Sequence, residues 1–262
     1  MSEQHNTERK KPMSLFNSIK LFIHPRVMTM LFLGFSAGVP ILLIFSTLGL
    51  WLNEAGVVKS TITFFSWAAL GYSFKFVWAP LVDRLPLPVI TKALGRRRAW
   101  MLVSQLAIMG AILLMSSVDP KASVESLTIM AYGAVLLGFS SATQDIVIDA
   151  YRIESADMDL QSMLSATYIA GYRIGMLVAG AGGLFIASYL GSTKELYSFD
   201  AWSGTYLMMA GVMLIGVATT LIINEPKSER KETEFSTTDY LRFFLLFLSC
   251  LLYTSPSPRD RG

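Results

Sequence analysis

Six long apolar runs recur along the chain and limit it to one broad class of fold. They cover residues 27–52, 61–82, 100–118, 127–150, 163–190 and 202–223. Each run is about long enough to cross the ~30 Å hydrocarbon core of a bilayer as a helix. The composition agrees, since 53% of the 262 residues are hydrophobic and only 16% are charged. A soluble protein needs far more polar covering, so the sequence predicts an all-α membrane protein.

Basic residues are distributed unequally between the two sides of these predicted helices. On one side, the connections carry single lysines, which are Lys59, Lys121 and Lys194. On the other side lie basic clusters within residues 1–26, 83–99 and 224–239. Lys and Arg collect in the cytoplasmic loops of membrane proteins. We therefore predict a multi-pass membrane protein with a cytoplasmic N-terminus.

The connection between the second and third runs carries the densest charge. Asp83 and Arg84 end one apolar run, and Arg96, Arg97 and Arg98 stand directly before the next. In hydrocarbon, each arginine costs about 2.5–3.5 kcal/mol even on the lenient insertion scale. The stretch is therefore predicted to be a tight loop at the cytoplasmic surface.

The apolar pattern divides the chain into five parts. We expect a cytoplasmic tail over 1–26, a six-helix bundle over 27–223, a cytoplasmic linker over 224–239 and the start of a seventh helix over 240–249. That last apolar run is too short to span a bilayer. Residues 250–262 resemble the translation of a sequencing adapter, and the single cysteine lies among them. We therefore expect a truncated chain from which a second six-helix bundle is missing.

Short similarities between the two halves of the predicted bundle indicate an internal repeat. GFSA at 34–37 in the first run recurs as GFSS at 138–141 in the fourth, and GYS at 71–73 in the second recurs as GYR at 171–173 in the fifth. This order matches a 3+3 repeat of opposite membrane orientation, the plan of one half of a major facilitator transporter. The many glycines of the fifth run predict close helix packing.

Four ionisable residues fall inside predicted spans, namely Lys75, Asp145, Asp149 and Arg173. Such groups mark functional sites in membrane proteins, because burying them without a partner is costly. At a helical rise of about 1.5 Å per residue, Lys75 lies roughly 10 Å and Asp145 roughly 9 Å from the cytoplasmic ends of their spans. Similar depth and opposite charge predict an ion pair between them. A static pair that only fixes packing is the alternative.

Arg173 is predicted to lie deepest, roughly 14 Å into the fifth span and near the midplane. A guanidinium at that depth needs a carboxylate, carbonyl groups or an anionic ligand. Tyr168 and Tyr172 stand one turn apart beside it, and Gln144 adjoins Asp145. Aromatic and amide groups suit sugar and peptide ligands, so Arg173, both tyrosines and Gln144 are the candidate substrate contacts. A structural pair of Arg173 with Asp145, or helix packing alone, is the alternative.

A second charged group is predicted near the cytoplasmic surface. Asp149 and Arg152 are three residues apart and share one helical face. With the loop charges they form a candidate cytoplasmic gate, made of Asp83, Arg84, Arg96, Arg97, Arg98, Asp149 and Arg152. Such a latch would hold the cytoplasmic side closed. The alternative is that these charges only orient the chain in the membrane and extend to water.

Several motifs resemble the muropeptide permease (AmpG-like) family of major facilitator transporters. They are FKFVWAPLVDR at 74–84, GRRRAW at 95–100, GFSAGVP at 34–40, ATQDIVIDA at 142–150 and GYRIGMLV at 171–178. The motifs follow the family order, and the resemblance covers about residues 25–226. It implies the six-helix N-terminal bundle of a major facilitator fold, with a 3+3 inverted repeat and truncation at the start of helix 7.

The resemblance also implies a function. Members of the family import anhydromuropeptides, which are glycopeptide fragments of the cell wall, across the bacterial inner membrane with the proton gradient. The expected partners are then the glycopeptide, protons, the lipid bilayer and a C-terminal six-helix bundle, with no cofactor, metal or nucleic acid. The acetyl-CoA transporter branch shares the fold and gives the alternative substrate class.

Asp145 is the predicted proton carrier. Movement of a nearby cation changes how readily a buried carboxylate takes up a proton, and Lys75 is the predicted cation. Asp149 lies closer to water and to Arg152. It is therefore the weaker candidate.

An enzyme function is the remote alternative. The spacing Asp145-x-x-x-Asp149 also occurs in intramembrane prenyltransferases, which use it to hold Mg²⁺ and a diphosphate. Those enzymes need a second acidic motif on another helix, whereas Asp157 and Asp159 fall in a short predicted loop. Both histidines precede the first apolar run, so no histidine metal site is expected inside the membrane. We predict a transporter and not an enzyme.

Overall fold

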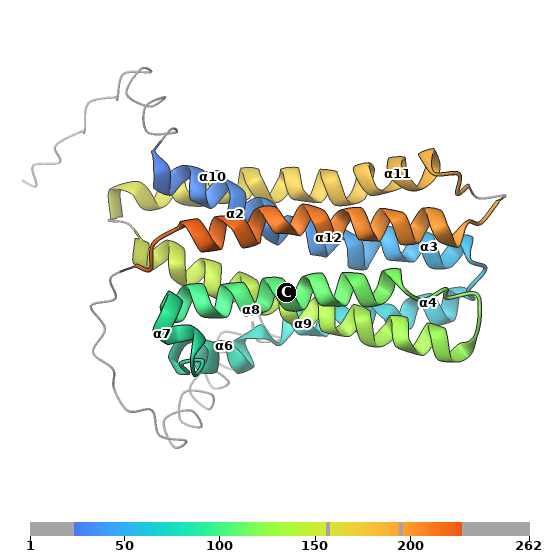
Figure 1. Ribbon diagram of the computed structural model, residues 1–262, viewed down its shortest axis with the longest axis horizontal. Helices are drawn as coiled ribbons and strands as arrows, with labels where there is room; N and C mark the ends of the chain where they lie inside the picture. The colour runs from blue at the N-terminus through green and yellow to red at the C-terminus, as the bar shows by residue number, and fades with distance from the viewer. Residues whose placement is uncertain (1–23, 156–157, 194–195, 227–262) are drawn as a thin grey trace, which may run out of the picture.

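The structure is a computed structural model that describes residues 24–155, 158–193 and 196–226. Every regular element in these residues is a helix, so the predicted all-α class is confirmed. Figure 1 shows the long helices lying side by side along the longest axis of the molecule. The end of the bundle that carries Arg96–Arg98, where α12 also ends, is called the arginine end below. Of the predicted parts, the linker beyond 226, the seventh-helix start 240–249 and the segment 250–262 lie outside the described residues, as does most of the tail 1–26.

Five helical stretches are long and apolar enough to cross a membrane, and they correspond to five of the six predicted runs. They cover Pro25–Glu54, Arg96–Ser116, Val124–Ser155, Leu160–Tyr189 and Phe199–Ile222. The first contains α2 (Pro25–Leu42), the π-helical turn η1 (Leu43–Thr47) and α3 (Leu48–Glu54). The fourth contains α10 (Met158–Leu177), the π-helical turn η3 (Val178–Gly182) and α11 (Gly183–Tyr189). The other three are the single helices α8 (Arg96–Ser116), α9 (Val124–Ser155) and α12 (Phe199–Ile222).

The second predicted run is helical but not continuous, which corrects the expectation of one helix over 61–82. It consists of α4 (Lys59–Phe65), the 3₁₀ turn η2 (Ser66–Ala69), α5 (Leu70–Ser73) and α6 (Lys75–Arg84). Phe74, between α5 and α6, has φ of −100° and ψ of 8° and is not helical. Residues with low helix propensity, such as Thr61, Thr63 and Gly71, are frequent in this run. The short helix α7 (Ile90–Leu94) then leads into α8.

The helix α9 extends beyond its predicted end at residue 150 and continues to Ser155. Apolar length alone marks where a helix leaves hydrocarbon, but not where it ends. The last turn carries Arg152 and Glu154, which are tolerated because they lie past the apolar part of the helix. This extension places both charges at the arginine end.

The helices α2 and α10 touch along a line of glycines. A side-chain carbon added at Gly34 or Gly38 would overlap a backbone carbonyl of α10, and one added at Gly171 or Gly175 would overlap a carbonyl of α2. Small residues allow such close backbone approach where lipid provides no hydrophobic drive between helices. The close packing expected of the glycines in the fifth run is therefore present at this interface.

We expect Gly171→Ala to destabilise the protein by about 1–3 kcal/mol, because the added methyl group meets the backbone oxygen of Leu31. Gly110→Ala on α8 is the matched control, since nothing lies within 4 Å of its added carbon. That change is expected to be neutral, or stabilising by about 0.5–1 kcal/mol. Thermal unfolding in detergent measures both variants. Equal unfolding temperatures for the two would contradict the packing described here.

At the end opposite the arginines, hydrogen bonds join α3 to α12 and to the connections between the helices. The Glu54 carboxylate, at the end of α3, accepts bonds from the Trp202 indole N–H and the Ser192 hydroxyl, each at 2.7 Å. The Trp51 indole N–H donates to the Tyr197 hydroxyl at 3.3 Å, and that hydroxyl donates to Asp119 at 2.7 Å. These contacts hold α3, the α8–α9 connection and the start of α12 together.

Candidate functional site

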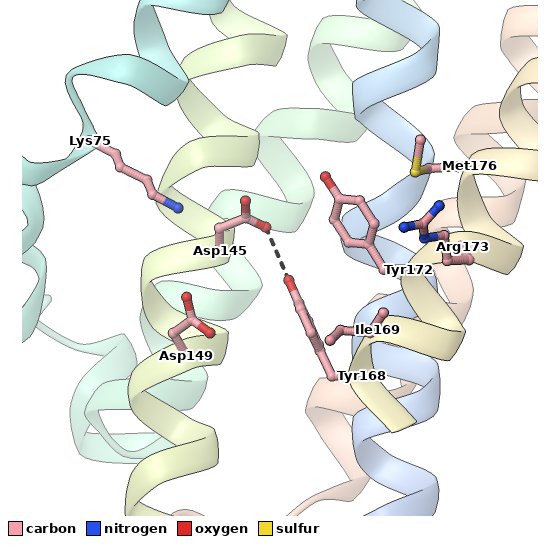
Figure 2. A pocket seen from close by; sticks show the side chains of 8 residues that line it. All are labelled: Lys75, Asp145, Asp149, Tyr168, Ile169, Tyr172, Arg173 and Met176. Carbon is pink, nitrogen blue, oxygen red and sulfur yellow. Dashed lines mark hydrogen bonds between the residues drawn. The ribbon is translucent and has the colours of Figure 1, made fainter. Parts of the chain in front are cut away.

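A cavity of about 560 Å³ opens between α6, α9 and α10. Its lining includes four charged residues and two tyrosines. The complete set is Lys75, Asp145, Asp149, Tyr168, Ile169, Tyr172, Arg173 and Met176 (Figure 2). All four intramembrane charged residues singled out from the sequence thus line one cavity. The volume falls within the range of small-molecule binding sites.

Asp145 is the most buried charged group of this cavity, with 8% of its surface exposed. The helix α9 presents Asp145 and Asp149 on one face, because residues four apart lie one turn apart. The Tyr168 hydroxyl donates a long hydrogen bond of 3.4 Å to the Asp145 carboxylate (Figure 2). Asp145 is therefore a carboxylate that faces the cavity and has one neutral donor, an arrangement in which proton uptake is chemically feasible.

Lys75 approaches the same carboxylate from the other wall. It is the first residue of α6 and is partly buried. Figure 2 shows its amino group directed toward α9 and Asp145. Among the residues that the structure describes, no ion pair within 4.0 Å joins Lys75 to Asp145. The two groups share the cavity, and their pairing stays a prediction.

The helix α10 supplies the third wall. The rings of Tyr168 and Tyr172 lie 6.0 Å apart and tilted by 44°, and both hydroxyls point toward α9 in Figure 2. Arg173 also lines the cavity, and its side chain is exposed. It makes no ion pair within the described part of the chain, which leaves its guanidinium available to an anionic group. The alternative, a structural ion pair of Arg173 with Asp145 within 4.0 Å, is not found among the described residues.

Gln144 lies apart from the other candidate substrate contacts. It is fully buried, and its amide donates to the Ser36 hydroxyl at 3.0 Å. Neighbouring helical residues point about 100° apart, since a turn takes 3.6 residues. Because Asp145 faces the cavity, Gln144 is turned toward α2 instead. A contact between Gln144 and a ligand stays a prediction, and the cavity lining gives it no support.

At the arginine end, Arg97 is the centre of an ion-pair cluster. Its guanidinium donates to Asp83 at 2.7 Å, and to the two carboxylate oxygens of Glu154 at 2.6 and 3.1 Å. Only 3% of Arg97 is exposed. The fork geometry of arginine suits this bidentate contact. The cluster therefore links α6, α8 and α9.

Arg98 and Glu225 join the start of α8 to the end of α12. The Arg98 guanidinium donates to the carbonyls of Thr220 and Leu221 at 3.0 and 2.7 Å. The Glu225 carboxylate accepts the backbone N–H groups of Arg97 and Arg98 at 2.7 and 3.1 Å. A carboxylate at a helix N-terminus and a cation at a C-terminus both form hydrogen bonds with unpaired backbone groups. Their charges also interact favourably with the helix dipole.

Asp149 and Arg152 lie on α9 between Asp145 of the cavity and Glu154 of the arginine end. They form the expected pair at 3.1 Å, and 47% of the Asp149 side chain is exposed. The Arg152 guanidinium also lies 5.9 Å from the centre of the Tyr168 ring. Thus Asp149 belongs to both candidate groups. Arg96, in contrast, has no ion pair among the described residues, and Arg84 ends α6.

The sequence-based selection missed Glu154 and Glu225. Each is an acidic residue close to the end of a predicted span on the side of the basic clusters. That position could have indicated them, because carboxylates close to several arginines can form ion pairs and hydrogen bonds with them. Choosing between the acidic residues still required the tertiary contacts, which join positions 57 and 128 residues apart.

The two acidic residues of the cavity, Asp145 and Asp149, are not joined by a third potential metal ligand in the described ranges. No group of three or more His, Cys, Asp or Glu side chains in the described ranges has metal-binding geometry. The cavity places Lys75 and Arg173 beside Asp145 and Asp149. A prenyltransferase site needs a second acidic motif to share its Mg²⁺ ions, and the other lining residues do not provide one.

Comparisons with known proteins agree with this architecture. The sequence profile of the Major Facilitator Superfamily matches residues 27–256. A Rickettsia conorii protein named as an AmpG 4 transporter is 35% identical over 213 residues, which are 81% of this chain and 49% of that protein. The anhydromuropeptide permease of Escherichia coli K12 is 36% identical over 209 residues, 79% of this chain and 39% of the permease.

The chain spans about half the length of the curated relatives it matches. The matched residues include both charged groups, the segmented second span and the five continuous spans apart from Pro25 and Arg26. Membership of a transporter family is consistent with a ligand-sized cavity between the helices. It also excludes the alternative of a prenyltransferase enzyme. The chain therefore belongs to the Major Facilitator Superfamily of membrane transporters and, within it, is AmpG-like.

Proposed function

We propose that this chain forms the N-terminal half of a proton-coupled transporter that imports anhydromuropeptides across the bacterial inner membrane for cell-wall recycling. The observation that carries the proposal is the buried Asp145 beside a ligand-sized cavity, in a chain related to a permease named for this substrate. In this proposal the N-terminus and the arginine end face the cytoplasm. A C-terminal six-helix bundle completes the transport path, in keeping with the greater length of the relatives.

The lining chemistry supports a glycopeptide ligand. Arg173 has an exposed guanidinium that can bind a peptide carboxylate. Tyr172 and Tyr168 offer ring faces and hydroxyl groups to sugar and amide groups. Lys75 adds a second positive charge on the opposite wall. In the proposed complex the ligand lies in the cavity between α6 and α10, next to Asp145 of α9.

Proton coupling is assigned to Asp145 and Lys75. When Asp145 binds a proton, it no longer attracts the Lys75 ammonium, and the contact between α9 and α6 weakens. When the proton leaves, the carboxylate attracts the ammonium again. Alternation between these two arrangements couples proton movement to the positions of the helices around the ligand. Tyr168 stays bonded to Asp145 as a neutral donor in the deprotonated form.

The cluster at the arginine end is proposed to stabilise the form that is closed to the cytoplasm. Arg97, Asp83 and Glu154 lock the inner ends of three helices together. Asp149, which lines the cavity, and Arg152, with which it pairs, lie on the same helix as Glu154. Asp145, Asp149 and Glu154 follow one another along α9, so a movement of α9 at Asp145 is proposed to change the position of Glu154 in the gate.

Uptake in cells tests the proposed substrate. The full-length transporter, expressed in a bacterium that lacks its own permease, is expected to restore accumulation of labelled anhydromuropeptide. Residues 1–262 expressed alone are expected to enter the membrane without restoring uptake. Transport of acetyl-CoA in place of the muropeptide would overturn the substrate assignment. Full uptake by residues 1–262 alone would overturn the assignment as half a transporter.

A further inference from the structure

The helix that carries Lys75 does not continue the segment before it. The helix α5 ends at Ser73, and α6 begins at Lys75 after the non-helical Phe74. Because the regular helix is interrupted there, its backbone hydrogen bonds alone do not fix the direction of α6 relative to α5. Other contacts must hold Lys75 in the direction seen in Figure 2.

Two side-chain hydrogen bonds attach this region to α9, one on each side of the interruption. The Tyr72 hydroxyl donates to the Ser141 hydroxyl at 2.6 Å. The Trp78 indole N–H donates to the Thr143 hydroxyl at 3.2 Å. Both acceptors are buried, with 0% of Ser141 and 5% of Thr143 exposed. Water does not compete for such bonds in the interior of a membrane protein.

The position of these bonds along the chain is symmetric about Lys75. Tyr72 lies three residues before it, and Trp78 lies three residues after it. The Trp78 ring also packs 4.6 Å from the ring of Phe139 on α9. The acceptors Ser141 and Thr143 precede Asp145 by four and two residues on the same helix. Both bonds thus join the region around Lys75 to the part of α9 that carries Asp145.

We propose that Tyr72 and Trp78 are positioning residues that hold Lys75 toward Asp145 through their bonds to Ser141 and Thr143. Neither of them lines the cavity, so they act through Lys75 and not by touching the ligand. The inference rests on the proposed function, in which Lys75 and Asp145 act together in proton coupling. It assigns a role to the tryptophan of the FKFVWAPLVDR motif.

Thr143→Val in the reconstituted full-length transporter removes the acceptor for Trp78 and keeps the shape of the side chain. Gradient-driven accumulation is expected to fall about fivefold, whereas substrate exchange without a gradient stays within about twofold. Thr143→Ser restores the hydroxyl and is expected to restore accumulation. Thr219→Val is the matched control, because both threonine hydroxyls donate to the carbonyl four residues earlier and only Thr143 also accepts from Trp78.

Lys75→Met separates this inference from the proposed function. If Lys75→Met keeps gradient-driven accumulation, the coupling role of Lys75 is wrong and the inference falls with it. If Lys75→Met loses accumulation but Thr143→Val and Ser141→Ala keep it, only the inference is overturned.

Tyr72→Phe provides a second route if Thr143→Val does not reach the membrane. It deletes one hydroxyl and is expected to lower accumulation about fivefold while exchange continues. Unchanged accumulation in Tyr72→Phe would overturn the inference. Failure of both variants to reach the membrane, while Thr219→Val reaches it, would assign the two bonds to assembly and would also overturn it.

Discussion

Asp145→Asn in the full-length transporter is expected to abolish proton-driven accumulation of substrate and to leave substrate exchange measurable. The amide keeps the shape of the carboxylate and can still accept from Tyr168, but it cannot carry a proton. With one proton per substrate, a gradient of one pH unit supplies about 1.4 kcal/mol, or about tenfold accumulation. The wild-type protein is expected to approach this ratio in vesicles, and Asp145→Asn to stop at equal concentrations inside and outside.

Asp149→Asn is the matched control for this change. Asp149 lies one turn away on α9, lines the same cavity and is paired with Arg152, but its side chain is 47% exposed. Loss of Asp149 is expected to weaken the gate and lower the rate, while the gradient still drives accumulation. A purely structural Asp145 would instead lose membrane abundance, or both activities together. Gradient-driven accumulation by Asp145→Asn would show that another group carries the proton.

Arg97→Gln is expected to have the largest effect at the arginine end. It removes a buried guanidinium and leaves the carboxylates of Asp83 and Glu154 without their shared partner. Loss of one member of such a cluster is expected to cost on the order of 3 kcal/mol of stability. Arg96→Gln is the control, since Arg96 has no ion pair within the described ranges. Thermal unfolding of the two purified variants measures the difference.

The same variant tests the gate. If Arg97 holds the inner ends of α6, α8 and α9 together in the closed form, Arg97→Gln is expected to favour the form open to the cytoplasm. Cysteine probes placed near the inner end of the cavity would then react faster from the cytoplasmic side. The arginines also orient the chain during insertion, so topology is checked in parallel. Unchanged probe reactivity with correct topology would leave stability as the role of Arg97.

Much of the fold was predictable, because hydrophobic length is a direct requirement of crossing a bilayer. Five apolar runs became five long helices, with ends within a few residues of the expectation except at α9. The prediction of one helix for the second run was wrong, because the apolar character of a run does not show whether its backbone hydrogen bonds are continuous. Phe74 is apolar, and nothing in its type shows that it interrupts a helix.

The charged residues of the candidate site could be predicted from the sequence, whereas their contacts with other residues could be predicted less well. Lys75, Asp145 and Arg173 stood out because charge inside an apolar run is rare and costly. Their common cavity depends on how each helix is rotated, which composition does not determine. The same rotation turned Gln144 toward Ser36 and away from the cavity. Glu154 was missed because its contact to Arg97 joins distant parts of the chain.

Substrate-driven proton movement is the most direct measurement of proton coupling through Asp145. Full-length transporter in vesicles with a trapped pH indicator, and with no imposed gradient, is given anhydromuropeptide on the outside. The lumen is expected to acidify with the wild-type protein as substrate enters, and to stay at constant pH with Asp145→Asn although labelled substrate still equilibrates. Equal acidification by the two proteins, or substrate entry into wild-type vesicles without any acidification, would contradict proton coupling through Asp145.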